Sequence, residues 1–163
     1  MQGIAKAFLI TIITTAMILV FINLAFFFPW YLTLVVETYN VSQVVAGDNY
    51  LKQSNYEDAL ERLQERPIFR DKADDIEIIV VKQDMDIVIS DDNAIGNDDE
   101  TYYYDLPEAD KPYQQRGKSL KVEIKAVYPF SITLWGKPVE REMPVSFSMT
   151  TTGLKHYKDL DYY

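Results

Sequence analysis

The hydrophobic pattern divides the chain into an apolar beginning and a mixed remainder. No charged side chain occurs from Ala7 to Val36, and almost every residue in this run is apolar. As a helix, about 30 residues would measure about 45 Å, whereas about 20 residues cross a bilayer core. The run therefore predicts a single-pass membrane anchor that continues as a helix beyond the membrane. We place the anchor at residues 1–36 and an extracytoplasmic domain at residues 37–163.

The flanking charges predict how the anchor is oriented. Lys6 precedes the run, and Glu37 is the first charge after it. Because basic residues beside a span tend to stay cytoplasmic, we expect the N-terminus inside the cell and the domain outside. Trp30 and Tyr31 suit the outer interface, which would put the span at residues 7–29. The alternative is a cleaved signal peptide, but the apolar region of such peptides is shorter.

A second helical stretch is predicted over residues 37–66. Apolar residues recur there at three-to-four spacing, as on one face of an amphipathic helix. Ser54 and Glu57 have the spacing of a capping box, so we expect a break near residue 53 and a new helix after it. Pro67 would end that helix.

The rest of the chain is rich in β-branched residues and alternates in polarity. Strands are predicted at residues 76–81, 85–90, 120–126, 131–135 and 144–149. A sheet with one wet face needs a cover on the other. The predicted fold class is therefore α+β, with the amphipathic helix packed on a small antiparallel sheet of four or five strands. Residues 91–118 are too polar to bury in bulk, and we expect them to form a long excursion that projects from the body or is partly mobile.

Composition narrows the chemistry. The net charge is −9, the chain has no cysteine, and His156 is its single histidine. Disulfides, thiolate metal sites and cysteine nucleophiles are excluded, and an acidic domain is repelled by nucleic acid. We interpret His156 as a surface residue, and no catalytic constellation is present, so we expect a protein that is not an enzyme.

One loop has the composition of a cation site. Carboxylate and amide oxygens are the ligands that Ca²⁺ prefers, and the loop offers Asp91, Asn93, Asp98 and Asp99. The standard calcium loop does not fit, because Tyr102 stands at its twelfth position. A looser calcium site and a solvated acidic turn without any cofactor are the two interpretations, and the turn is the default.

Two further groups of residues are candidates for contacts with partners. Exposed tyrosines often mark interfaces, and chain ends are seldom core, so Tyr157, Tyr162 and Tyr163 are predicted to form an interface. Packing on the sheet is the alternative. Asn23 is an amide inside the apolar run, where it gains from a partner on another helix.

The N-terminal half resembles a known family. Phe26-Phe27-Phe28-Pro29 followed by Leu32-Thr33-Leu34-Val35-Val36-Glu37 is similar to the proline, apolar and glutamate run of TadE-like minor pilins of tight-adherence pilus systems. The resemblance covers roughly residues 8–65. Pilins usually carry glutamate at the fifth mature position, which is Phe8 when counted from Gly3.

The resemblance implies a pilin-like subunit of a bacterial pilus, secretion or conjugation apparatus, which acts by assembly. Its partners would be the membrane and other membrane or filament subunits, in a homo- or hetero-oligomer. Asn23 and Pro29 mark the helix-association surface, and the cell membrane or a surface filament is the expected location. The alternative is a bitopic extracytoplasmic ligand-binding or sensory domain, which would need a partner to signal.

Overall fold

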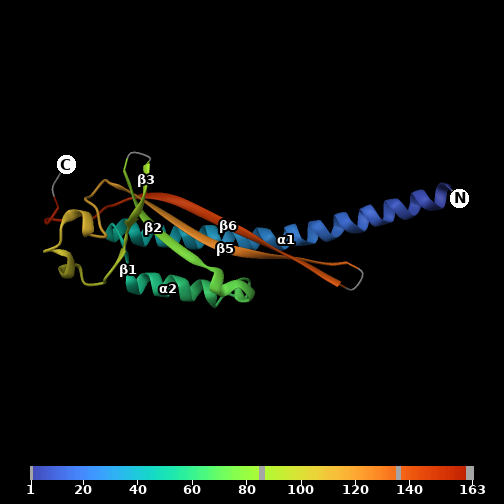
Figure 1. The fold of residues 1–163 in the computed structure, drawn as a ribbon, viewed down its shortest axis with the longest axis horizontal. Coiled ribbons are helices and arrows are strands. Elements are labelled where there is room, and N and C mark those ends of the chain that lie inside the picture. The colour runs from blue at the N-terminus through green and yellow to red at the C-terminus, as the bar shows by residue number, and fades with distance from the viewer. Residues whose placement is uncertain (1, 85–86, 135–136, 161–163) are drawn as a thin grey trace.

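A single long helix forms the axis of the molecule. The structure is a computed structural model that describes residues 2–84, 87–134 and 137–160. Helix α1 (Gln2–Asp48) is continuous over 47 residues, and its N-terminal part projects beyond the folded body (Figure 1). The remaining elements pack around its C-terminal part. They are, in chain order, β1 (Leu51–Lys52), α2 (Gln53–Gln64), η1 (Arg70–Asp75), β2 (Glu77–Asp84), β3 (Ile87–Asn93), β4 (Ile95–Gly96), η2 (Glu100–Tyr103), η3 (Glu108–Asp110), β5 (Ser119–Leu134) and β6 (Lys137–Thr152).

The main sheet is antiparallel and has the strand order β3-β2-β5-β6. Strands β5 and β6 form a hairpin whose register runs without a shift from Ser119↔Thr152 to Leu134↔Lys137. The segment predicted at residues 120–126 and the described part of the one predicted at residues 131–135 are thus parts of one 16-residue strand, and Trp135 lies outside the described residues. A separate parallel pair joins β1 to β4. The predicted α+β class and small antiparallel sheet are confirmed.

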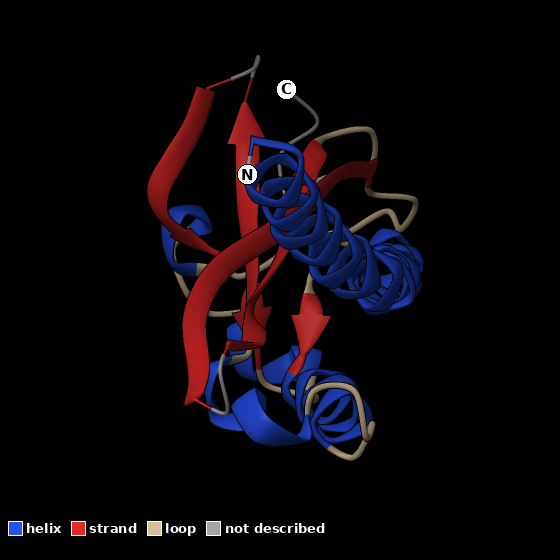
Figure 2. Ribbon diagram, turned by 90° about the vertical axis from the view of Figure 1, so that its right-hand side faces the viewer, coloured by secondary structure: helices blue, strands red, loops and turns tan. Residues whose placement is uncertain are grey.

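The sheet has one buried face, and alternation along its strands determines which. On β5 the residues Leu120, Val122, Ile124 and Ala126 are buried, whereas the residues between them are half-buried or exposed. Helices α1 and α2 lie together on this side (Figure 2). The result is the two-layer arrangement that the alternation predicts.

The helix enters the core earlier than the sequence pattern suggests. Trp30 is only 2% exposed, and its ring packs against Phe69 and Tyr128 at centroid distances of 5.2 Å. The prediction that Trp30 lies in the outer interfacial belt is therefore wrong. Its large aromatic side chain instead fills the space between the helix and the sheet, where burial of its ring stabilises the packing. The folded body takes in α1 from about Phe27 onward, well before residue 37.

Helix α1 ends at a residue that the sequence analysis did not single out. Asn49 has a positive φ of 59°, a conformation that asparagine tolerates at helix C-termini. Its side chain is buried and donates to the carbonyls of Gln114 and Lys155, while its Oδ1 accepts from the Lys155 amide. One residue therefore stops the helix and fastens two distant segments to its end.

The predicted capping box of α2 is wrong. The helix begins at Gln53, and its N-cap residue Lys52 makes no side-chain cap bond. Instead Asp98, from the loop after β4, accepts from the Ser54 amide at 3.0 Å. A carboxylate that is distant in sequence thus accepts the hydrogen bond from the helix amide, in place of a local capping side chain.

Residues 91–118 pack against the body, so the prediction that they project is also wrong. The segment supplies β4, η2 and η3, and it buries Ala94, Tyr103, Lys111 and Tyr113. A Cβ at Gly96 would lie 2.5 Å from the Tyr103 hydroxyl, so glycine permits the close packing of this segment. Several of its polar groups form hydrogen bonds within the segment, with the end of α1 or with the C-terminal segment.

We predict that neighbouring leucines of α1 will differ sharply in their effect on stability. Leu34 is fully buried and Leu32 is 62% exposed. Leu34→Ala should lower the free energy of unfolding by about 2–5 kcal/mol, and Leu32→Ala should change it by less than about 0.5 kcal/mol. Urea unfolding of the full chain in detergent micelles measures both. Equal effects would contradict this placement of the helix.

Candidate functional site

The most distinctive surface is the exposed apolar part of α1. From Gly3 to Phe26 the side chains are exposed on all sides of the helix, apart from the half-buried Leu19 and Asn23. The most apolar 18-residue window has a mean hydropathy of 2.4, and none of it is buried. By length and composition, this helix is able to cross a membrane. An apolar surface of this size is not stable in water without a cover.

Asn23 and Pro29 lie where this exposed segment meets the folded body. The Asn23 side chain donates to the Leu19 carbonyl at 3.0 Å, one turn earlier, and its second N–H and its side-chain oxygen have further capacity for hydrogen bonds. Pro29 stands inside the unbroken helix, and Thr33 Oγ1 donates to the Pro29 carbonyl at 2.8 Å. The role of both residues in helix association stays a prediction.

The β5–β6 hairpin meets α1 at the same level. The Tyr128 hydroxyl donates to the Asn23 backbone carbonyl at 3.1 Å, and its ring packs edge-on against Phe27. Beside this contact lies an apolar groove of about 170 Å³. It is lined by Val20, Asn23, Leu24 and Phe27 of the helix and by Tyr128, Phe130 and Met143 of the hairpin.

A buried carboxylate joins the two helices. Glu37 of α1 is 2% exposed and forms ion pairs with Arg62 and Arg66 near the C-terminal end of α2. The Asn40 side-chain amide donates to Glu37 Oε2, the oxygen nearer Arg62, at 3.3 Å. Because both arginines are partly exposed, the pair fixes α2 against α1 without burying two charges. The glutamate that carries the TadE-like resemblance is therefore a structural residue of this fold.

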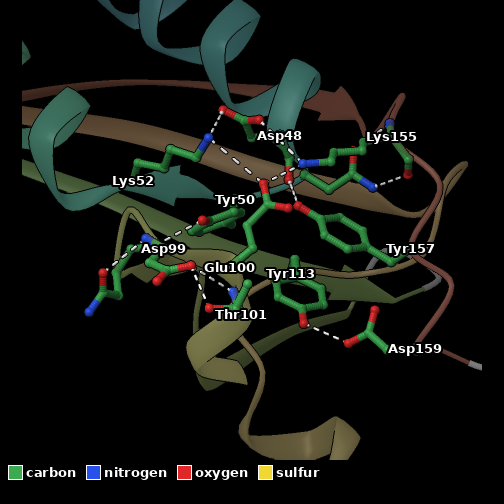
Figure 3. Close-up of polar contacts among 12 residues, drawn as sticks. Asp48, Tyr50, Lys52, Asp99, Glu100, Thr101, Tyr113, Lys155, Tyr157 and Asp159 are labelled. Carbon is green, nitrogen blue, oxygen red and sulfur yellow. Dashed lines mark hydrogen bonds and ion pairs between the residues drawn. The ribbon is translucent and has the colours of Figure 1, made fainter. Parts of the chain in front are cut away.

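At the far end of the molecule from the N-terminus, buried tyrosines fasten the C-terminal segment. Tyr113 and Tyr157 stack with ring centroids 4.0 Å apart, and Tyr50 and Tyr103 pack around them. The Tyr157 hydroxyl donates to the carbonyl of Asp48, the last residue of α1, at 2.7 Å. We call this group of four rings the distal cap; Tyr50, Tyr113 and Tyr157 are labelled in Figure 3.

An ion network covers the distal cap. Lys52 lies 3.2 Å from Asp48 and 3.7 Å from Glu100, and Lys155 pairs with the same two carboxylates (Figure 3). The four side chains alternate in sign, so each charge is compensated. They join β1, the end of α1, η2 and the C-terminal segment.

Burial and neighbouring charges shift several pKa values in the distal cap. Desolvation raises the pKa of the Tyr50, Tyr113 and Tyr157 phenols well above the usual value, so all three stay neutral donors. At Asp159 burial acts against the charge, but hydrogen bonds from Lys111 and Tyr113, both at 2.7 Å, outweigh it and lower the carboxyl pKa.

The structure places the predicted calcium ligands in turns. Asp99 accepts from the amide and hydroxyl of Thr101, Asp98 caps α2, and Asn93 accepts from the Ile95 amide. The side chain of Asp91 lies outside the described residues. Within the described part of the chain, no three Asp, Glu or His side chains gather as a metal site would require. Calcium binding stays a prediction, and backbone capping accounts for these oxygens.

The predicted tyrosine interface needs correction. Tyr157 is 3% exposed, so it belongs to the core and offers no contact area to a partner. It is buried because Tyr113 and the end of α1 provide both a stacking surface and an acceptor for its hydroxyl. Tyr162 and Tyr163 lie outside the described residues. His156 is exposed, as predicted.

Comparisons with known proteins do not assign the chain to a family. No protein-family model, curated protein or solved structure matches it. The resemblance to TadE-like proteins is therefore carried only by the residues quoted for it above.

We predict that acid will weaken the distal cap through Asp159. Because its pKa is lowered in the folded state, its contribution to stability is present above the unfolded pKa of about 3.9 and is lost as the pH falls through the folded value. Urea midpoints should therefore fall less for Asp159→Asn than for the wild type between about pH 5 and pH 3. Asp105→Asn, at an exposed loop position, is the control and should follow the wild type. Parallel curves for Asp159→Asn and the wild type would contradict the assignment.

Proposed function

We propose that this protein is a membrane-anchored, pilin-like subunit that acts by assembling with other subunits through the exposed part of α1. The observation that carries the proposal is that the two parts of one helix have different surroundings. Its N-terminal part is apolar and uncovered on all sides, while its C-terminal part is the core of the folded body. Such a helix holds the body at a fixed orientation to the membrane or to a filament core.

The charges support the proposed orientation. Lys6 is the single charged side chain before Glu37, and the body beyond it is strongly acidic. The N-terminus would lie in the cytoplasm and the body outside the cell. The acidic body would stand away from anionic headgroups and present the distal cap outward.

The contact surface with other subunits would include Asn23. Its side-chain amide lies at the edge of the apolar segment, and interhelical hydrogen bonds in hydrocarbon contribute about 0.6 kcal/mol and up to about 1.7 kcal/mol. The assembly would belong to a bacterial pilus, secretion or conjugation apparatus.

The absence of cysteine allows a direct test by crosslinking in cells. Single cysteines at Ile12 and Met17, which are 55% and 59% exposed, should give crosslinked multimers through the apolar segment. A cysteine at Asp58, exposed on α2, is the control at the surface of the body and should give few. An intact, membrane-bound monomer at every position would overturn the proposal.

A matched pair of variants tests the role of Asn23. Asn23→Leu should weaken self-association about threefold to tenfold, as expected for the loss of one interhelical hydrogen bond. Thr11→Leu removes a polar group that also bonds back to a carbonyl one turn earlier, but at an exposed position far from the body. It should leave association unchanged. Equal losses in the two variants would show that general polarity, and not Asn23, is the determinant.

A further inference from the structure

The outer part of the β5–β6 hairpin is a two-stranded ribbon that reaches along the apolar helix. Strand β2 pairs with β5 only as far as Lys125, so residues 128–134 and 137–143 pair with each other alone. We call this ribbon the arm. It runs in the N-terminal direction of α1 and diverges from the helix toward its end (Figures 1 and 2). In the part of the chain that the structure describes, no third strand pairs with the hairpin beyond Lys125.

The two faces of the arm differ in chemistry. Because directly opposite residues of an antiparallel pair share a face, the continuous register places Arg141 beside Phe130 and Val139 beside Ile132. Phe130 and Met143 line the groove against α1, so this is the inner face. Lys137 joins it by alternation along β6. The inner face is therefore apolar and basic, and Val139 and Met143 on it are 47% and 39% exposed.

The outer face carries the opposite charge. Glu140 lies opposite Ser131, and Glu142 lies opposite Pro129, where it pairs with Lys72 of η1 at the root of the arm. Two cations on one face and two carboxylates on the other give the arm no net charge. This segregation is typical of an element that lies on a membrane surface, with its apolar and basic side toward the lipid.

The length of the helix brings the arm to the membrane. From Ala7, the first residue after Lys6, to Phe26, α1 rises about 28 Å, which matches a hydrocarbon core of about 30 Å. Tyr128 contacts Asn23 at the upper end of this segment, and β5 continues about 20 Å further toward the N-terminus. An open ribbon with charged side chains is not stable inside hydrocarbon. The arm must therefore leave the helix at the membrane surface.

We propose that the arm opens away from α1 and lies on the outer leaflet of the anionic membrane that holds the helix. Swinging outward from its root turns the inner face toward the lipid and the outer face toward water. Arg141 and Lys137 then bind lipid phosphates, while Phe130, Ile132 and Val139 reach the acyl boundary. The proposal rests on the membrane anchoring that forms part of the proposed function.

Charge complementarity favours phospholipid over a second copy of the chain as the partner of this face. Residues 2–36 contain no acidic side chain, so the apolar helix of another subunit offers nothing to neutralise Lys137 and Arg141. The phosphate groups of anionic lipids carry the negative charge that neutralises both cations. The acidic body is repelled by the same surface, so the contact is confined to the arm.

The full chain, reconstituted in vesicles, tests the proposal. A fluorophore on Val139→Cys reports the inner face, and one on Ser131→Cys reports the outer face. With brominated lipids in phosphatidylglycerol vesicles, the probe at residue 139 should be quenched and the probe at residue 131 should not. The double variant Lys137→Gln/Arg141→Gln should weaken arm contact on the order of 30-fold. Lys118→Gln/Lys158→Gln, which removes the same charge from exposed positions of the body, should leave it unchanged.

The outcomes separate the arm from the anchor. Flotation of the chain with the vesicles without quenching at residue 139 would overturn the arm proposal and leave the anchoring intact. Failure to float would overturn the anchoring itself. Quenching that is equal in phosphatidylcholine, or is unaffected by Lys137→Gln/Arg141→Gln, would reject the role of the two cations. Crosslinks from Val139→Cys to a second copy would show that a neighbouring subunit covers this face.

Discussion

One helix has to satisfy two environments. The N-terminal part of α1 exposes apolar side chains in every direction, whereas its C-terminal part buries Leu34, Val41 and Val45 under the sheet. Because the helix is continuous, it links the position of the body to that of any membrane or filament core around its N-terminal part. The contacts of Trp30 and Tyr128 near Asn23 determine where one environment gives way to the other.

The rest of the body is organised around the far end of that helix. Asn49 ends α1 and holds the segments that contain Gln114 and Lys155, and Tyr157 covers the last helical carbonyl. These bonds join residues more than 60 positions apart in the sequence. The distal cap therefore makes the short η helices and the C-terminal segment part of one core, although they contain little regular structure of their own.

Local sequence patterns predicted the helices and strands correctly more often than they predicted which side chains are buried. The uninterrupted apolar run gave α1, and the alternation from Leu120 to Ala126 gave the buried face of β5, because each pattern depends only on periodicity. Trp30 and Tyr157 were assigned to surfaces because aromatic residues suit both interfaces and cores, and only the packing partners decide between them.

Long-range bonds account for the features that the sequence could not reveal. Ser54 and Glu57 have the spacing of a cap, yet the carboxylate that caps α2 comes from Asp98, 44 residues later. Residues 91–118 are polar, but many of their polar groups bond within the segment or to α2, the end of α1 and the C-terminal segment, so the segment is able to pack. No local pattern encodes these pairings. The charge segregation on the arm was equally hidden, because it depends on the register between β5 and β6.

The continuity of α1 is tested most directly by hydrogen exchange of the full chain in lipid nanodiscs. The account predicts slow exchange throughout α1, with the amides of residues 30–48 protected by the core of the body and those of residues 4–22 by the bilayer. The amides between them, on both sides of Pro29, should also be slow. Rapid exchange at residues 24–31 with protection on either side would reveal a hinge, and would contradict a body held in place by a single rigid helix.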